Sequence, residues 1–303
     1  GWVPTIDEAV TDAPSKGNSE GIFGYGETAT NVSMSNLVNS SGVVASDVTG
    51  VGSARQAIAA CEYGEDKGIF GFGYTTGATG VTNLVSNAGV VATDVTGVGT
   101  ARYSLAACGY GDDKGIFGFG DTGSKVSMTN LVSNAGVVAT DVTGVGTARA
   151  YLAATQYGGD KGIFGFGTTA SGGSEVSMTN LVTNAGVVGT DVTGVGTARM
   201  GPAACEYGYD KGIFGYGENG GTDLSMTNLV SNAGVVATDT TGVGTARERL
   251  AACEYGEDKG IFGFGKTSSN VGMTNLVSNA GVVASDVTAV GTARRYLAAC
   301  SFN

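Results

Sequence analysis

The apolar residues of this chain lie in short runs that are separated by glycine, asparagine, aspartate and serine. In one stretch the runs cover residues 105–110, 115–120, 126–133 and 137–143. They are rich in β-branched and aromatic residues and too short for amphipathic helices, so they predict four β-strands. Alternation along the second run places Phe117 and Phe119 on one face and Gly118 and Gly120 on the other. We therefore expect the rings of one sheet to fit against the glycines of its neighbour.

This four-run pattern recurs along the chain. The string Gly-Ile-Phe-Gly marks the second strand and begins at residues 21, 68, 115, 162, 212 and 260. Two of the spacings between successive Gly-Ile-Phe-Gly strings are longer than the others. In both, the extra residues lie in the loop between the second and third strands. A loop that varies within a constant scaffold is a common place for binding function.

Six units of four short strands are typical of a β-propeller with one unit per blade. We expect residues 21–303 to form an all-β, six-bladed β-propeller of four-stranded antiparallel blades, with residues 1–20 as a separate N-terminal arm. The chain ends with a first strand at residues 297–302. This segment is expected to pair with the strand that begins at Gly21, which would complete the first blade and cover its edge.

The phrase Arg-x-x-Leu-Ala-Ala-Cys-x-Tyr-Gly-x-Asp-Lys-Gly-Ile-Phe-Gly-Phe-Gly resembles a kelch-type blade. Kelch blades run from an arginine through a small-residue strand and a short turn to an aliphatic-aromatic strand that ends in glycines. This sequence departs from that pattern in having Gly-Phe-Gly instead of adjacent glycines, and in lacking the tryptophan before the last bend. The near-identical repeats also resemble environmental, phage-type or fibre-associated propellers, which implies an extracellular or virion location.

Composition argues against several function classes. A net charge of −11 and a pI near 4.4 would repel nucleic acid. The chain has no histidine, which removes Ser-His-Asp and Cys-His catalysis. No apolar run approaches the length of a membrane span, so no membrane insertion is expected. Catalysis needs an asymmetric set of groups, whereas most polar residues here occur once in every repeat. We therefore expect neither an enzyme nor a bound cofactor or metal.

Each repeat carries an aspartate and, eight residues later, an arginine. The arginine fork can bind a carboxylate or cap carbonyl groups, so we expect these residues to stabilise the contacts between blades. A ring of six ion-binding sites is the alternative. The residues are Asp47 and Arg55, Asp94 and Arg102, Asp141 and Arg149, Asp191 and Arg199, Asp239 and Arg247, and Asp286 and Arg294.

The variable loop supplies the candidate ligand-binding residues. They lie in the fourth and fifth repeats and are Thr168, Ser171, Glu175, Glu218, Asn219 and Asp223. Six similar loops could bind glycans with an affinity raised by multivalency. A multivalent carbohydrate-binding propeller is therefore one functional hypothesis.

The N-terminal arm leads to the hypothesis that we favour from sequence. It contains Trp2, Val3, Ile6 and Val10, apolar residues that a solvated tail has no reason to contain. We expect them to be buried against another copy of the chain or another structural protein, as in a filament or a virus particle. The sequence thus predicts a non-enzymatic structural or assembly propeller.

Overall fold

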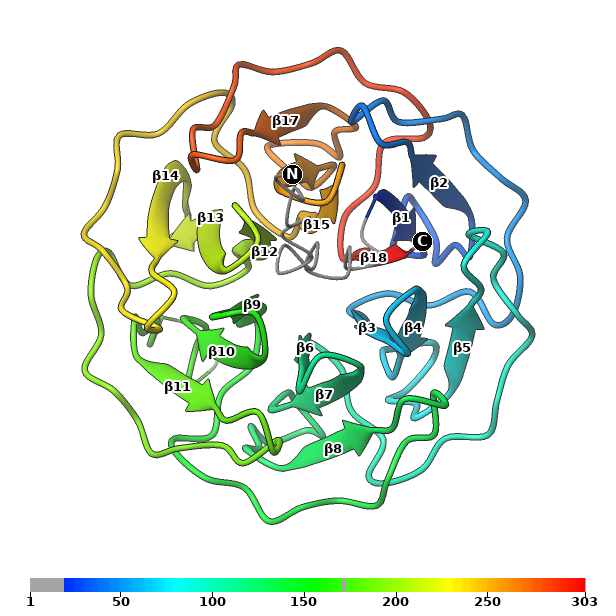
Figure 1. The fold of residues 1–303 in the computed structure, drawn as a ribbon. Coiled ribbons are helices and arrows are strands. Elements are labelled where there is room, and N and C mark those ends of the chain that lie inside the picture. Colours follow the sequence, from blue (N-terminus) through cyan, green and yellow to red (C-terminus); the bar gives the residue numbers. More distant parts are fainter. Residues whose placement is uncertain (1–18, 171–172, 303) are drawn as a thin grey trace, which may run out of the picture.

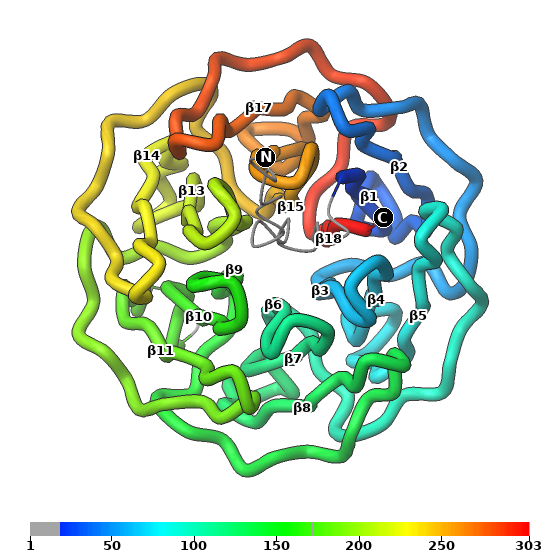
Figure 2. The backbone as a smooth tube through the Cα atoms, viewed as in Figure 1, coloured from blue at the N-terminus to red at the C-terminus, as the bar shows by residue number. Residues whose placement is uncertain are grey.

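The computed structural model describes residues 19–170 and 173–302, and these residues form an all-β structure. Their 18 strands make six three-stranded antiparallel sheets. The sheets are arranged around a common centre, with one strand of each sheet nearest to it (Figure 1). Figure 2 shows the chain passing once around this centre, with long segments at the rim that lead from one sheet to the next. No helix in the described ranges is long and apolar enough to cross a membrane.

Each sheet consists of an inner, a middle and an outer strand. The inner strands are β3 (Ala59–Tyr63), β6 (Ala106–Tyr110), β9 (Ala153–Tyr157), β12 (Ala203–Tyr207), β15 (Ala251–Tyr255) and β18 (Ala298–Phe302). The middle strands are β1 (Glu20–Gly24), β4 (Lys67–Gly71), β7 (Lys114–Gly118), β10 (Lys161–Gly165), β13 (Lys211–Asn219) and β16 (Lys259–Gly263). The outer strands are β2 (Ser35–Val38), β5 (Thr82–Val85), β8 (Thr129–Val132), β11 (Thr179–Val182), β14 (Thr222–Val230) and β17 (Thr274–Val277).

The first sheet is built from both ends of the chain. Strand β1 pairs with β2 on one side and with β18 on the other, where Ile22 lies opposite Cys300. The predicted pairing of the C-terminal segment with the strand that begins at Gly21 is therefore confirmed. Strand β18 also packs against β15 and β3, the inner strands of the two neighbouring sheets.

The prediction of a fourth strand in each blade is wrong, because each sheet of the described residues has three strands. In the third repeat the segment after β8 meets it only in two isolated bridges, Thr129 with Val142 and Val132 with Val138. The segment has one residue more than β8 between these bridges, which is a bulge and interrupts the ladder. The side chain of Asn130 fills the gap by donating to the carbonyl of Ala139 at 2.9 Å. The same pair of bridges recurs in the first repeat, between Ser35 and Val48 and between Val38 and Val44.

The expected packing of rings against glycines is confirmed for the strand residues. An added Cβ at Gly71 would lie 2.6 Å from the ring of Phe117 in the next sheet, and one at Gly118 would lie 2.7 Å from Phe164. The expectation that Phe119 shares a face with Phe117 is wrong. Strand β7 ends at Gly118, and Phe119 has a φ of 62°, which turns its ring to the opposite neighbour. There it packs against Phe164 with 5.2 Å between ring centroids.

Candidate functional site

The repeated aspartates join neighbouring sheets. Asp141 accepts hydrogen bonds from the backbone and hydroxyl of Thr100 and from Asn130, and the guanidinium of Arg102 lies 3.9 Å away. Thr100 and Arg102 belong to the preceding repeat. Each aspartate is thus linked to the arginine of the repeat before it, and we call this arrangement the aspartate latch. The six latches are Asp94 with Arg55, Asp141 with Arg102, Asp191 with Arg149, Asp239 with Arg199, Asp286 with Arg247, and Asp47 with Arg294.

The latch arginines are fully buried. Arg102 donates from Nε to the carbonyl of Phe119 at 2.8 Å, and its guanidinium lies 4.2 Å from the ring centroid of Phe72. A buried cation is tolerated when an anion, acceptors and an aromatic face surround it. These contacts hold the arginine between two neighbouring sheets.

The latches predict a stability that depends on pH. Burial raises the pKa of Asp141. The hydrogen bonds from Thr100 and Asn130 and the charge of Arg102 together lower it by more, so the pKa lies below its ordinary value of 3.8. A depressed folded-state pKa contributes stability above the unfolded value, and this stability is lost as pH falls through the folded value. The melting temperature should therefore fall below about pH 4. We expect Asp141→Asn to lower the unfolding free energy at pH 7 by about 1–3 kcal/mol.

The difference between wild type and Asp141→Asn should shrink as the pH is lowered to about 3. Chemical denaturation at several pH values measures it. An equal difference at pH 7 and pH 3 would contradict the latch. Because the chain has no histidine, no imidazole titration complicates the neutral range.

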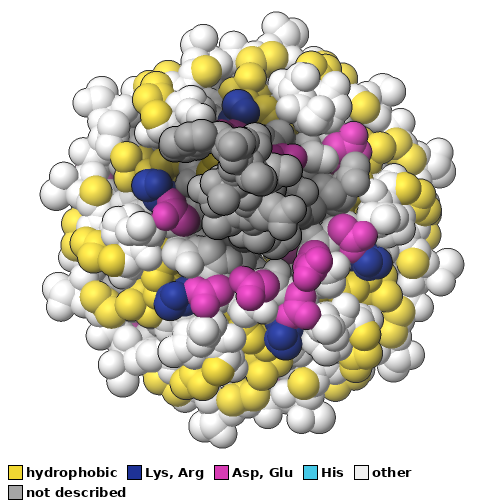
Figure 3. Space-filling view, in the orientation of Figure 1, with side chains coloured by type: hydrophobic (Ala, Val, Ile, Leu, Met, Phe, Trp, Pro, Cys, Tyr) yellow, Lys and Arg dark blue, Asp and Glu magenta, His cyan; other side chains and the backbone are white. Residues whose placement is uncertain are grey.

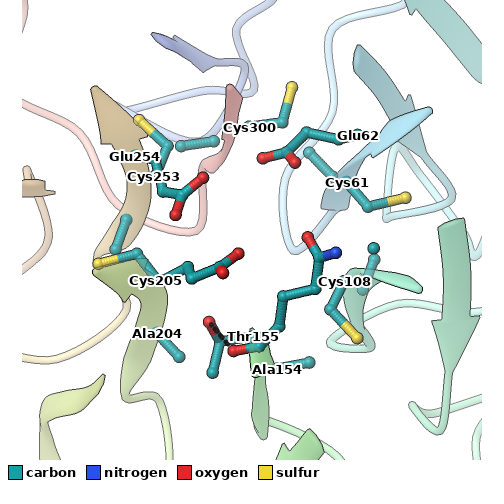
Figure 4. A pocket seen from close by; sticks show the side chains of 17 residues that line it. Cys61, Glu62, Cys108, Ala154, Thr155, Ala204, Cys205, Cys253, Glu254 and Cys300 are labelled. Atoms are coloured by element: carbon teal, nitrogen blue, oxygen red, sulfur yellow. Dashed lines mark hydrogen bonds between the residues drawn. The ribbon is translucent and has the colours of Figure 1, made fainter. Parts of the chain in front are cut away.

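The inner strands enclose a small cavity of about 50 Å³ at the centre. The carboxylates of Glu62 and Glu254 point toward its middle, whereas the cysteine sulfurs point away (Figure 4). Cys108 packs against Gly162 of the next sheet, and burial raises the pKa of its thiol to about 12. Such a thiol is protonated and unreactive at neutral pH. Within the described part of the chain, no group of three or more histidine, cysteine or acidic residues could hold a metal.

The turns between inner and middle strands carry paired charges. Lys114 lies 2.5 Å from Asp113, which also accepts a hydrogen bond from Asn134. Figure 3 shows basic side chains beside acidic ones around the centre of one face. These pairs neutralise one another and tie the turn to the outer segment of its own sheet. They are Asp66 with Lys67, Asp113 with Lys114, Asp160 with Lys161, Asp210 with Lys211, and Asp258 with Lys259.

The most variable residues of the repeat gather where the inner strands begin, and we call this region the variable end. Backbone bridges bring its positions together, as when Tyr103 pairs with Asp121 and Asp121 with Lys125. The repeat pattern alone does not show that these positions lie together, because they belong to six different repeats. In chain order the first two positions after each arginine are Gln56 and Ala57, Tyr103 and Ser104, Ala150 and Tyr151, Met200 and Gly201, Glu248 and Arg249, and Arg295 and Tyr296. Their loop partners are Tyr74, Asp121, Thr168, Glu218, Lys266 and Glu27.

Six of these residues form a ring of backbone hydrogen bonds, which we call the axial ring. Each N–H donates to the carbonyl of the equivalent residue in the preceding sheet at 2.8–2.9 Å, and Ala57 donates to Tyr296, so that the series returns to its start. Gly201 and the other five residues have positive φ. The ring brings into proximity side chains that lie in six different repeats. Its members are Ala57, Ser104, Tyr151, Gly201, Arg249 and Tyr296.

The side chains of the axial ring are asymmetric. Tyr151 and Tyr296 come from opposite sheets, yet their ring centroids are 6.3 Å apart. The guanidinium of Arg249 lies 4.8 Å from the centroid of Tyr296, and its Nε lies 3.1 Å from the carboxylate of Glu248. Burial raises the pKa of Glu248, although Arg249 and Lys266 oppose this shift. Aromatic rings and buried charges from different repeats therefore lie close together at the centre of the variable end.

The candidate loop residues contribute to this area unequally. Glu218 and Asp223 are cross-strand partners, because β13 and β14 extend to nine residues and replace the expected loop with a hairpin. Thr168 is buried and donates to the carbonyl of Ala170. Glu175 forms a backbone bridge with Thr168, and Asn219 donates to the carbonyl of Ala198. Ser171 lies outside the described residues, as do Trp2, Val3, Ile6 and Val10 of the predicted arm.

Comparison with known proteins provides no family for this architecture. No protein-family model matches the sequence, and no curated protein matches it. The resemblance to kelch blades therefore rests only on the repeated sequence from the arginine to Gly-Phe-Gly. A functional proposal has to be argued from the residues of the variable end.

Proposed function

We propose that the chain is a closed six-bladed β-propeller that acts as a non-enzymatic binding module, with glycans as ligands at the variable end. The observation that carries the proposal is the distribution of sequence differences. The repeats are nearly identical in the strands, in the latches and in the outer segments, while their most diverse residues meet around the axial ring. A rigid scaffold that presents diverse side chains at one end is the usual arrangement of a binding protein.

Glycans are favoured by the kinds of side chain at this end. Tyr74 and Tyr103 pack edge to face with 5.2 Å between centroids, and both are partly exposed. Tyrosine offers an apolar face for the C–H surface of a sugar and a hydroxyl for hydrogen bonds. Carboxylates are held close by, as in the pair of Asp121 with Lys125 at 2.5 Å, and can accept from sugar hydroxyls.

A glycan array with the full chain tests this proposal. We expect binding to a subset of glycans and weaker binding after Tyr103→Gln, which introduces the residue found at the equivalent position, Gln56. Tyr209→Ala is the matched control, because Tyr209 is exposed in the turn that follows β12, at the far end of that strand from the variable end. A chain that binds no glycan would exclude this function.

Assembly is the second candidate function, and the rim supports it. One valine at the same repeat position is 60–65% exposed in every sheet, a regular apolar surface that a neighbouring molecule could cover. These residues are Val43, Val90, Val137, Val187, Val235 and Val282. In this proposal the arm joins copies or a structural partner in an extracellular or virion particle.

Deleting residues 1–18 should leave the sheets folded and weaken assembly, because it removes the apolar residues of the arm. Light scattering and electron microscopy measure the particle size, with circular dichroism as the control for folding. If the shortened and full chains assemble equally, or if both remain monomeric at high concentration, assembly through the arm is wrong.

A further inference from the structure

Three polar atoms at the variable end are buried without a hydrogen-bond partner among the described residues. They are Oγ of Ser104, Oε2 of Glu248 and Nε of Arg249. The last two form an ion pair at 3.1 Å, but their alignment does not make a hydrogen bond. Buried polar groups are normally satisfied, so such a group indicates a missing partner. The Nε–H of Arg249 lacks an acceptor, Oε2 of Glu248 lacks a donor, and the hydroxyl of Ser104, which can donate and accept, has no partner. A sugar hydroxyl can act as donor or as acceptor.

These unpartnered groups lie at one common location on the axis, not at six equivalent locations in the six repeats. Ser104 and Arg249 belong to opposite sheets of the ring, as do Tyr151 and Tyr296. The approach of the two tyrosine rings to 6.3 Å brings the opposite sides together at the axis. The variable loops would provide a site in every blade, whereas the axis provides a single site per molecule.

Charge around this place selects the class of sugar. Glu218 and Asp223 face each other across the β13–β14 hairpin, and Glu248 lies beside Arg249 and 3.5 Å from Lys266. Two further cations lie over the axial tyrosines, Lys125 over Tyr151 and Arg295 over Tyr296. Each cation is already paired with a carboxylate, Lys125 with Asp121, Arg295 with Glu27, and Arg249 and Lys266 with Glu248, so none is left to bind an anionic group. Burial raises the pKa of Asp223; the charge of Lys266 opposes this shift, that of Glu218 adds to it, and that of Arg249 opposes it. An anionic sugar would meet repulsion here, while an uncharged one would not.

We infer that the axial ring is the binding site for one uncharged sugar residue per molecule. In this arrangement the rings of Tyr151 and Tyr296 contact the C–H face of the sugar, and Glu248 and Arg249 bind its hydroxyls. The inference rests on the proposed glycan-binding function and narrows it to one site, one stoichiometry and one class of sugar.

Calorimetry with the full chain tests the inference, using neutral oligosaccharides that end in galactose, glucose, mannose or N-acetylglucosamine, and their sialylated or uronate-bearing counterparts. The variants Tyr151→Ala and Arg249→Ser introduce residues that the fold already holds at equivalent positions, Ala57 and Ser104. We expect a stoichiometry near one, a preference for neutral glycans, and an affinity roughly tenfold or more lower in each variant. Tyr209→Ala should bind as the wild type does, and thermal melting checks that all variants are folded.

Several outcomes separate this inference from the proposed function. A stoichiometry near six, or unchanged affinity in both axial variants, would move the site to the loops and leave glycan binding intact. A preference for sialylated or uronate glycans would overturn the assignment of an uncharged sugar. Absence of binding to every glycan would overturn the axial site and the proposed function together.

Discussion

Removing strand β18 is expected to unfold most of the molecule. A chain that stops at residue 297 would expose the edge of β1 and lose the buried side chains of Cys300 and Phe302. It would also remove the hydroxyl of Ser301, which contacts the backbone of Glu254 in the neighbouring sheet. Loss of one buried aromatic ring costs about 3–5 kcal/mol, a large part of the roughly 5–15 kcal/mol that stabilises a typical domain.

Near-ultraviolet circular dichroism and thermal melting measure this effect. The matched control is a circular permutant in which residue 302 is joined to residue 20 by a short linker and the new ends lie in the exposed turn near Glu65. The permutant keeps the β18–β1 pair and should fold, which distinguishes loss of the strand from a change of termini. A truncated chain with an unchanged cooperative transition would show that the six sheets do not depend on one another.

The regular parts of this architecture could be predicted because they depend on local pattern. The β-branched and aromatic runs indicate the strands, and the Gly-Ile-Phe-Gly string indicates which residues pack between sheets. The offset between the first and last units predicts that β18 joins β1. The bulge after β8 could not be predicted in this way, because Asn130 replaces a backbone partner by its side chain. The turn of Phe119 depends on a positive φ that the alternation rule does not include.

The proposed binding site could not be predicted from the sequence for a different reason. In nearly identical repeats, the sequence does not say whether Asp141 meets the arginine of its own repeat or Arg102 of the preceding one. In the same way, Tyr151 and Tyr296 are far apart in the sequence and meet only because the sheets are arranged around one centre. The available signal was variation itself, since the residues after each repeated arginine differ while their surroundings stay the same.

Phe117→Ala is expected to lower the unfolding free energy by about 3–5 kcal/mol, because its ring is fully buried between two sheets. Gly118→Val tests the opposite face of the same strand. The first atom of the new side chain would lie 2.7 Å from the ring of Phe164, closer than real contacts allow, so about 1–3 kcal/mol should be lost through overpacking. Denaturant unfolding measures both changes, and Gly77→Val is the control because nothing lies within 4 Å of an added Cβ there.

A double-mutant cycle separates this packing from a general intolerance of valine in the strand. Phe164→Ala opens the space that the new side chain of Gly118→Val would need, so part of the cost of Gly118→Val should disappear in the double variant. Residues in contact commonly show coupling of about 0.5–3 kcal/mol, whereas independent sites add within about 0.5 kcal/mol. Additive costs would mean that Phe164 does not occupy the hollow above Gly118. Coupling would establish that the stability of each sheet depends on a ring supplied by the next, which is the physical basis for treating the six repeats as one cooperative structure.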